Sequence, residues 1–324
     1  MIYRDSNAIE QSVENVIAVT KEVYMNRFLQ LLEQDAKTVE ARLEEVLSLT
    51  KIGGEIYRPE KLVMSMRHGA LNGGKRLRPF LLMQVGKLFS ANQHHLLQAA
   101  VALECVHCYS LIHDDLPAMD DDDLRRGKPT VHKAFNEATA ILAGDALLTL
   151  AFDILSSKST HDDPETRITL ISKLAKASGI GGMVGGQMLD LHPESNSPDF
   201  HEIARMQAMK TGALIQFACE AGAICGQASE KELDALTSYG QSIGQAFQLA
   251  DDILDVTASQ KQLGKGTGKD DKQGKQTQLS ALGLNAAREM ADDLIYKACK
   301  SLSIFGERSN LLVEAAHFTV SRQN

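Results

Sequence analysis

The spacing of apolar residues is the feature that most limits the fold of this chain. They recur three and four positions apart almost throughout, the repeat of an amphipathic α-helix. Alternating runs of Val, Ile and Thr are few, and no Asn-Gly or Asp-Gly turn is flanked by alternating apolar residues. We therefore predict an all-α chain. The expected helical windows are 23–49, 60–70, 77–89, 95–116, 133–156, 165–190, 200–226, 231–256 and 280–303.

The organisation of the chain favours one large helical domain. A length of 324 residues allows two domains, but no Ser/Gly/Pro-rich linker divides the sequence and no internal repeat is apparent. The longer loop-like segments are 157–164, 192–199 and 260–277. The most apolar stretch, 138–155, carries two aspartates, which favours a buried core helix over a bilayer span.

Composition excludes some classes of function. The formal net charge is -8, from 34 basic and 42 acidic residues, which argues against a nucleic-acid-binding protein. The N-terminal sequence has no secretory pattern, and no run of about 18 uninterrupted apolar residues exists. We expect a cytoplasmic protein without stable membrane insertion. Five scattered cysteines suit a reducing compartment, namely Cys105, Cys108, Cys219, Cys225 and Cys299.

An aspartate-rich run, DDLPAMDDDD at 114–123, directly follows a strongly apolar helical segment. Like charges at the C-terminus of a helix are unfavourable, so the run requires a compensating cation. Asp114 and Asp120 would not share a face on a straight helix. Pro117 removes this objection because proline breaks the helix between them.

A second acidic cluster occupies one helix face, since Gln248, Asp251, Asp252 and Asp255 stand at i, i+3, i+4 and i+7 among apolar residues. Partly desolvated carboxylates must be paired, neutralised or bound to metal. Oxygen donors without His or Cys suit Mg²⁺ or Mn²⁺. Because Mg²⁺ usually bridges a few carboxylates to substrate phosphates, two such clusters indicate a diphosphate held between them.

Basic residues suited to phosphate stand near the first cluster. Lys75 and Arg78 lie i, i+3 in GGKRLRP, and the twin arginines Arg125 and Arg126 follow the aspartates. His107 stands two turns before Asp114, although a lone histidine is more often a core residue. These residues predict an anion-binding set beside the metal site.

Five motifs together resemble the short-chain trans-isoprenyl diphosphate synthases of the polyprenyl synthetase family: ALNGGKRLRPF, DDLPAMDDDDLRRG, AILAGDALLTLAF, MKTGAL and QLADDILD. They occur in the family's order, and the resemblance extends from about Arg58 to Arg322. It implies one isoprenoid synthase domain over 31–324, folded as a helical bundle around a central cavity. Residues 1–30 form an N-terminal extension, helical or partly disordered, to which we assign no function.

The resemblance implies a role for each matching residue. The magnesium ligands are Asp114, Asp115, Asp120, Asp251, Asp252 and Asp255. Three ions are expected when the allylic substrate is bound, and Mn²⁺ can substitute for Mg²⁺. Isopentenyl diphosphate is bound by Lys75, Arg78, His107 and Arg126. The allylic diphosphate or its reacting end is met by Arg125, Lys210, Thr211, Gln248 and Lys265, and the first four of these are the expected catalytic residues.

The implied reaction is electrophilic. The allylic C–O bond ionises, the double bond of isopentenyl diphosphate attacks the carbocation, and loss of a proton gives a product five carbons longer. Tyr109 and its neighbour Ser110 lie about one turn before the first aspartates, where an aromatic ring would stop chain growth. Together with the Pro117-Ala118 insertion this predicts a C15 product. The family also implies a homodimer.

Several alternatives remain open from the sequence. A C10 or C20 product is the nearest, and a terpene cyclase is disfavoured because DDILD keeps its aspartates. His107 and the pair His113-Asp114 could indicate an HD-type metal phosphohydrolase, which leaves the other motifs unexplained. An inactive regulatory subunit tends to lose an aspartate cluster, and both are present. The glycines at 179–186 do not form a dinucleotide fingerprint and more plausibly permit close helix packing.

Overall fold

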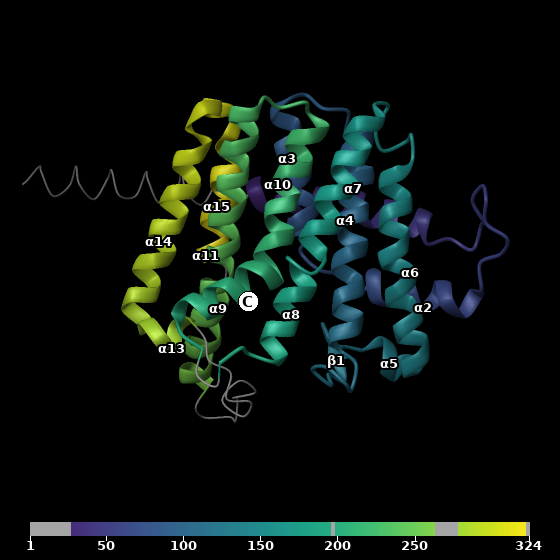
Figure 1. The fold of residues 1–324 in the computed structure, drawn as a ribbon, viewed down its shortest axis with the longest axis horizontal. Helices are drawn as coiled ribbons and strands as arrows, with labels where there is room; N and C mark the ends of the chain where they lie inside the picture. The colour runs from purple at the N-terminus through teal and green to yellow at the C-terminus, as the bar shows by residue number, and fades with distance from the viewer. Residues whose placement is uncertain (1–26, 196–197, 263–277, 322–324) are drawn as a thin grey trace, which may run out of the picture.

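The computed structural model describes residues 27–195, 198–262 and 278–321 and is a bundle of long helices (Figure 1). This confirms the all-α prediction. A first helix covers 27–46. The α-helices that follow are α2 (Glu60–Ala70), α3 (Leu77–Leu88), α4 (Gln93–Asp114), α5 (Val131–Ala134), α6 (Glu137–Ser156), α7 (Pro164–Ser178), α8 (Met183–Leu191), α9 (Phe200–Gln207), α10 (Ala213–Cys225), α11 (Glu230–Gln262), α13 (Gln278–Leu282), α14 (Leu284–Ser301) and α15 (Asn310–Ser321).

Four predicted windows are interrupted where the sequence suggested continuous helix, two of them briefly: 133–156 at residues 135–136 and 280–303 at Gly283. The window 165–190 divides into α7 and α8 at Gly179–Gly182, because the chain leaves helical geometry at these glycines. The window 200–226 contains a π-helical turn, η1 (Ala208–Gly212), between α9 and α10. A 3₁₀-helix, η2 (Leu302–Ser309), joins α14 to α15. Both interruptions near residue 180 and residue 210 adjoin the site described below.

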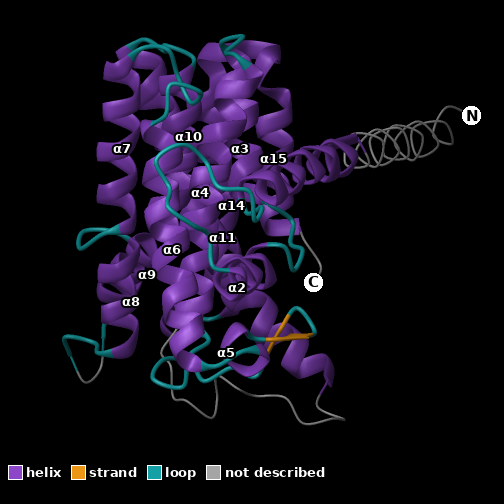
Figure 2. Ribbon diagram, turned by 90° about the vertical axis from the view of Figure 1, so that its right-hand side faces the viewer, coloured by secondary structure: helices purple, strands orange, loops and turns teal. Residues whose placement is uncertain are grey.

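Helix α4 forms the centre of the bundle, with α2, α3, α6 and α10 packed around it (Figure 2). Its residues 99–103 are fully buried. The helix is apolar on all sides rather than along one stripe, which is the pattern of a helix enclosed by others. The side chain of Asn92 begins α4 by accepting a hydrogen bond from the His94 N–H. Because α4 is fixed on every side, its C-terminal end is a rigid support for Asp114.

A two-stranded hairpin is the only β-structure among the described residues. Strands β1 (Leu124–Arg125) and β2 (Lys128–Pro129) pair antiparallel, with Arg125 opposite Lys128. Arg126 and Gly127 between them both have positive φ, 54° and 75°. This is the geometry of a two-residue type I′ turn, which usually carries Asn-Gly. An Arg-Gly turn escaped the sequence prediction for that reason.

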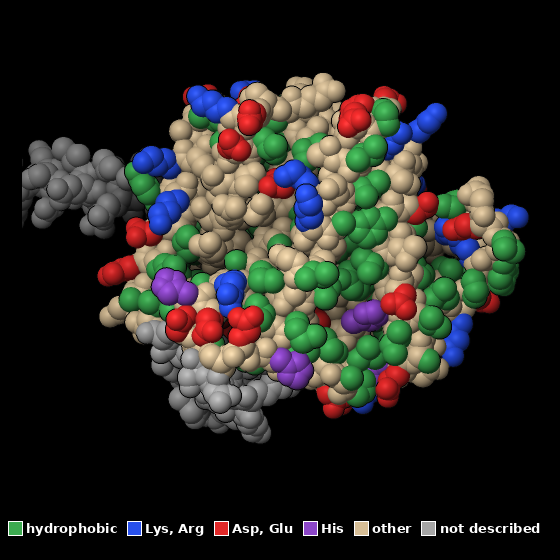
Figure 3. Space-filling view, viewed as in Figure 1, with side chains coloured by type: hydrophobic (Ala, Val, Ile, Leu, Met, Phe, Trp, Pro, Cys, Tyr) green, Lys and Arg blue, Asp and Glu red, His purple; other side chains and the backbone are tan. Residues whose placement is uncertain are grey.

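Helix α6 is more exposed than its composition predicted. Both α4 and α6 are long and apolar enough to cross a membrane by length and composition, but 72% of the apolar window is buried in α4 and only 39% in α6. Ile141 and Leu142 on α6 are 45% and 58% exposed. Hydrophobic side chains gather over the surface formed by α6 and α8 (Figure 3). The prediction that 138–155 is a buried core helix is therefore only partly correct.

Candidate active site

A cavity of about 870 Å³ opens at the C-terminal end of α4. Its walls come from the loop before α3, from α4, the β1 end of the hairpin, α8, η1, α11 and α15. Most of the residues predicted from the sequence line it. These are Lys75, Arg78, His107, Tyr109, Ser110, Asp114, Arg125, Arg126, Lys210, Thr211, Gln248 and Asp251.

The end of α4 and the Pro117 turn bring the first aspartates together. The Asp120 N–H donates to the Asp114 carbonyl at 2.8 Å, and the Met119 N–H donates to the Leu116 carbonyl at 2.9 Å. The pKa of Asp114 is raised to about 6, mainly by desolvation, with Lys210 opposing the shift and Asp120 adding to it. A carboxylate whose charge is poorly solvated is a group that a cation would stabilise.

Asp115 lies beside Asp114 but is committed to the hairpin. Its carboxylate is 3% exposed and accepts hydrogen bonds from Arg125, whose Nη2 and Nε lie 2.6 Å and 2.7 Å from Oδ1. Burial raises the pKa of Asp115, and Arg125 opposes that shift. In this structure Asp115 orients Arg125, and its role as a metal ligand stays a prediction.

The second cluster does not present all its members to the cavity. Gln248 and Asp251 line it. Asp252 instead accepts hydrogen bonds from Gln207 Nε2 at 3.3 Å and from the Gln278 N–H at 3.2 Å. Burial raises the pKa of Asp252 to about 6, against the effect of these donors. Asp252 thus ties α11 to α9 and α13.

Asp120, Asp252 and Asp255 do not line the cavity, although Asp120 interacts electrostatically with Asp114 and Asp255 with Asp252. Lys265 lies outside the described residues. The proposed metal-binding or substrate-binding roles of these residues stay predictions.

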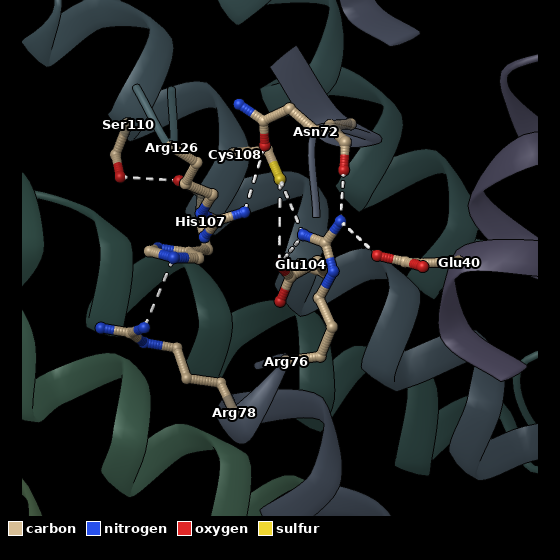
Figure 4. A network of polar contacts seen from close by, with 10 residues as sticks. Glu40, Asn72, Arg76, Arg78, Glu104, His107, Cys108, Ser110 and Arg126 are labelled. Carbon is tan, nitrogen blue, oxygen red and sulfur yellow. Dashed lines mark hydrogen bonds and ion pairs between the residues drawn. The ribbon is translucent and has the colours of Figure 1, made fainter. Parts of the chain in front are cut away.

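The basic residues form a pocket on one side of the cavity (Figure 4). Arg78 Nη1 lies 3.5 Å from His107 Nε2, and Arg126 Nη1 donates to Asn72 Oδ1 at 3.1 Å. The ammonium of Lys75 lies 5.6 Å from the centre of the Phe318 ring. Burial and then Arg78 hold the pKa of His107 well below its usual range. The ring is therefore neutral at pH 7 and can donate one N–H to an anion.

Lys210 and Thr211 belong to the π-helical turn η1, a feature that often marks functional sites. Lys210 Nζ lies 2.8 Å from Asp190 Oδ2 on α8. Two glycines permit the close packing of η1. A Cβ on Gly186 would lie 2.2 Å from the Lys210 backbone nitrogen, and one on Gly244 of α11 would lie 3.0 Å from the Gly212 Cα. The prediction that glycines in the α8 segment serve close packing is confirmed for Gly186.

Substituting Gly186 with alanine tests this packing. A Cβ that meets backbone atoms forces η1 to move, so we expect a loss of about 1–3 kcal/mol in unfolding free energy together with slower turnover. Thermal unfolding and steady-state kinetics measure the two effects. Gly181→Ala is the matched control because a Cβ there meets nothing within 4 Å. Equal behaviour of the two variants would contradict the account of η1.

Four cavity-region residues were missed by the sequence interpretation. Asn72 holds Arg126, Phe318 contacts Lys75, and Asp190 pairs with Lys210. Gln187 lines the cavity, and its side-chain amide atoms are buried without a hydrogen-bond partner among the described residues. Gln187 and Asp190 stand three apart in the sequence GQMLD, a spacing that places both on one helix face. That polar pair in an apolar helix was the available signal.

The residues present fit a magnesium ion shared with a phosphorylated substrate. Asp114 and Asp251 line the cavity from different helices and offer only oxygen donors. Within 27–195, 198–262 and 278–321, no three His, Cys, Asp or Glu side chains are grouped closely enough to hold a metal. One or two carboxylates, completed by phosphate oxygens and water, is the arrangement that Mg²⁺ commonly takes.

Residues 59–303 match the family model of the polyprenyl synthetases. The chain belongs to this family. The resemblance predicted from five motifs is therefore confirmed. The match extends from the start of α2 through α14, so it includes both aspartate clusters and the basic pocket.

Individual relatives of this polyprenyl synthetase differ in their named products. Farnesyl diphosphate synthase of Escherichia coli K12 is 52% identical over 258 residues, covering 78% of this chain and 85% of the relative. Geranylgeranyl pyrophosphate synthase 11 of Arabidopsis thaliana is 41% identical over 288 residues, covering 87% and 81%. A solved FPP/GFPP synthase from Zymomonas mobilis has a TM-score of 0.81 and 43% identity, covering 92% and 100%.

Proposed function

We propose that this polyprenyl synthetase is a farnesyl diphosphate synthase, a prenyltransferase. It condenses isopentenyl diphosphate head-to-tail with dimethylallyl diphosphate and then with geranyl diphosphate, giving (2E,6E)-farnesyl diphosphate and diphosphate. The observation that carries the proposal is the placement of Asp114 and Asp251 on one cavity with a separate basic pocket. Such a cavity suits two diphosphates, one between the aspartates and one among the cations. The relatives named farnesyl diphosphate synthase support the C15 assignment.

Magnesium is the proposed cofactor, with Asp114 and Asp251 as its first candidate ligands and Asp120 close by. When bound, the metal would supply positive charge to the leaving diphosphate of the allylic substrate. Lys210 lines the same cavity and interacts electrostatically with Asp114. The Lys210 ammonium would contact the same diphosphate while it keeps its ion pair with Asp190.

The residues of the basic pocket would bind isopentenyl diphosphate. Lys75, Arg78 and Arg126 supply positive charge, and neutral His107 adds a hydrogen-bond donor. Isopentenyl diphosphate keeps its diphosphate group during the reaction, so these donors hold and orient the substrate, and most of the rate would come from stabilising the charge of the leaving allylic diphosphate. The pocket therefore both orients the attacking double bond and separates the two diphosphates.

The remaining cavity walls would protect and direct the carbocation. Apolar side chains on four elements exclude water that would otherwise quench it, among them Met119, Met183, Ile215 and Phe247. The Thr211 hydroxyl and the Gln248 amide oxygen can present partial negative charge to the cation. The released diphosphate is the proposed base for the final proton, so no dedicated side-chain base is required.

Tyr109 supports a C15 product. Its side chain is 6% exposed, lines the cavity and packs edge-on against His113, with ring centres 5.7 Å apart. A ring held this rigidly one turn below Asp114 would block a longer tail. The alternative, a C20 product, is favoured by the relatives named geranylgeranyl pyrophosphate synthase.

The protein is further proposed to act as a homodimer in the cytoplasm. The support is the exposed apolar face of α6, since Leu142 is 58% exposed on a helix apolar enough to require cover. We expect Leu142→Glu to convert a dimer into a monomer in analytical ultracentrifugation. Tyr296→Glu on α14 is the control, because Tyr296 is also accessible, at 67% exposure, and α14 lies on the opposite side of the bundle from α6 (Figure 1). A monomeric parent protein would contradict the proposal.

Product release distinguishes this function from an HD-type phosphohydrolase. We expect inorganic diphosphate to be released only when magnesium, an allylic diphosphate and isopentenyl diphosphate are all present. Enzymatic assays specific for diphosphate and for orthophosphate measure the two anions separately. Release of orthophosphate from a single phosphoester substrate would support the hydrolase instead.

A further inference from the structure

Arg76 is a buried arginine at the edge of the cavity, between Lys75 and Arg78 in the sequence, and its guanidinium is held by contacts within the protein. Its side chain is 1% exposed, and Nη1 lies 2.6 Å from Glu104 Oε1 on α4. Nη2 lies 3.2 Å from Glu40 Oε1 and donates to the Ala70 carbonyl, the last residue of α2, at 2.6 Å. One guanidinium thus joins the helix 27–46, α2 and α4 at the start of α3 (Figure 4).

The backbone at Arg76 is in the left-handed region, with φ 48° and ψ 40°. This conformation is unfavourable for any residue with a Cβ, and glycine is its usual occupant. The same loop does use glycine at its other positive-φ positions, Gly73 and Gly74. An arginine at this position is therefore retained for its side chain, whose ion pairs offset the backbone cost.

The position of Arg76 determines where its neighbours point. Lys75 precedes it and Arg78 stands in the first turn of α3, and both line the cavity. Glu104 stands three residues before His107 on α4, so the pair Arg76–Glu104 also sets the register between α3 and the helix that carries His107. The contact between Arg78 and His107 crosses the same helix boundary.

Charge explains why the loop needs this counterion. Burial lowers the pKa of Arg126, and the nearby charge of Arg76 lowers it further. Glu104 pairs with Arg76 and also acts to raise the pKa of Arg126, while Glu40 pairs with Arg76 from the side away from Arg126 (Figure 4). Gathering several cations around one pocket is unfavourable before an anion arrives, and an internal carboxylate reduces that cost.

We propose that the Arg76–Glu104 ion pair is the positioning device of the isopentenyl diphosphate pocket: it holds Lys75, Arg78 and His107 in the geometry that binds the diphosphate, without touching it. The proposal rests on the proposed function for the identity of the ligand. It makes the ion pair selective for one substrate, because the allylic site is built on Asp114, Asp251 and Lys210, which other elements position.

The test compares Arg76→Lys and Glu104→Gln with Glu220→Gln. Glu220 on α10 is also a buried carboxylate and pairs with Lys173 on α7 at 2.8 Å, and neither residue lines the cavity. We expect the first two variants to raise KM for isopentenyl diphosphate about tenfold or more, while KM for geranyl diphosphate changes less than about twofold. Glu220→Gln is expected to lower Tm and leave both KM values unchanged. If Glu104→Gln does not fold, Glu40→Gln replaces it in the test. This variant removes only the longer ion pair of Arg76, so the rise in KM for isopentenyl diphosphate should be smaller.

Calorimetric titration of isopentenyl diphosphate without allylic substrate separates this inference from the proposed function. If Arg76→Lys loses affinity for isopentenyl diphosphate and Glu220→Gln does not, the positioning role of the Arg76–Glu104 pair is supported. This holds even if the parent protein forms no prenyl product. A parent protein that forms product, with Arg76 variants that keep parental affinity and lose only Tm, assigns the pair a purely structural role and overturns the inference.

Discussion

We expect Asp251→Asn to lower kcat/KM on the order of 10³-fold, whereas Asp252→Asn should stay within about tenfold of the parent protein. The two aspartates are neighbours in the same motif, but Asp251 lines the cavity and Asp252 accepts hydrogen bonds from Gln207 and Gln278. An asparagine at 251 removes a charge that the metal and substrate require. An asparagine at 252 keeps an acceptor for its donors and removes a carboxylate whose pKa is already raised by burial.

Steady-state kinetics over a range of Mg²⁺ concentrations measure this contrast. Asp251→Asn should also raise the magnesium concentration needed for half-maximal rate, and Asp252→Asn should show its main effect in Tm. Asp114→Asn is expected to behave like Asp251→Asn, since both line the cavity. Equal losses in the variants at 251 and 252 would mean that Asp252 turns toward the metal when substrate binds.

We expect Tyr109→Ala to shift the main product from the proposed C15 to C20 or longer. Tyr109 is 6% exposed and packs edge-on against His113 below Asp114, so truncation opens the cavity in the direction of the growing tail. Removing a buried aromatic side chain costs about 3–5 kcal/mol of stability, so the variant is assayed below its lowered Tm. Mass analysis of dephosphorylated products measures the chain length.

Tyr109→Phe is the matched control for chain length. Phenylalanine keeps the ring and removes only the hydroxyl, so the product should remain C15. A product that stays at C15 in Tyr109→Ala would clear this residue of the role and direct attention to other lining residues such as Met119.

The helical fold was predictable because its signal is repeated in every segment. Apolar spacing placed nearly every helix, but it missed α15 and the interruptions within the predicted windows. The π-helical turn η1 leaves no mark in apolar spacing, since one extra residue per turn shifts the pattern only locally. The hairpin at 124–129 was missed because its turn has Arg126 in the left-handed region, where Asn is usual. The Arg126 side chain bonds to Asn72, a contact that the sequence does not reveal.

The sequence predicted which residues form the site better than it predicted how they are arranged. Most of the residues identified by motif matching line the cavity. Motif matching could not tell Asp251 from Asp252, because neighbours on a helix project about 100° apart and the packing of α9 and α13 decides which one faces the cavity. Nor could it pair Asp115 with Arg125 or Asp190 with Lys210, since those contacts depend on the tertiary fold.

The most direct test is the product formed by the purified protein from dimethylallyl diphosphate, isopentenyl diphosphate and Mg²⁺. Mass spectrometry should find farnesyl diphosphate as the end product, with one diphosphate released for each five-carbon unit added. Accumulation of a C10 or C20 end product would contradict the assigned chain length. Absence of any prenyl product, with the substrates unchanged or hydrolysed to orthophosphate, would contradict the proposed function itself.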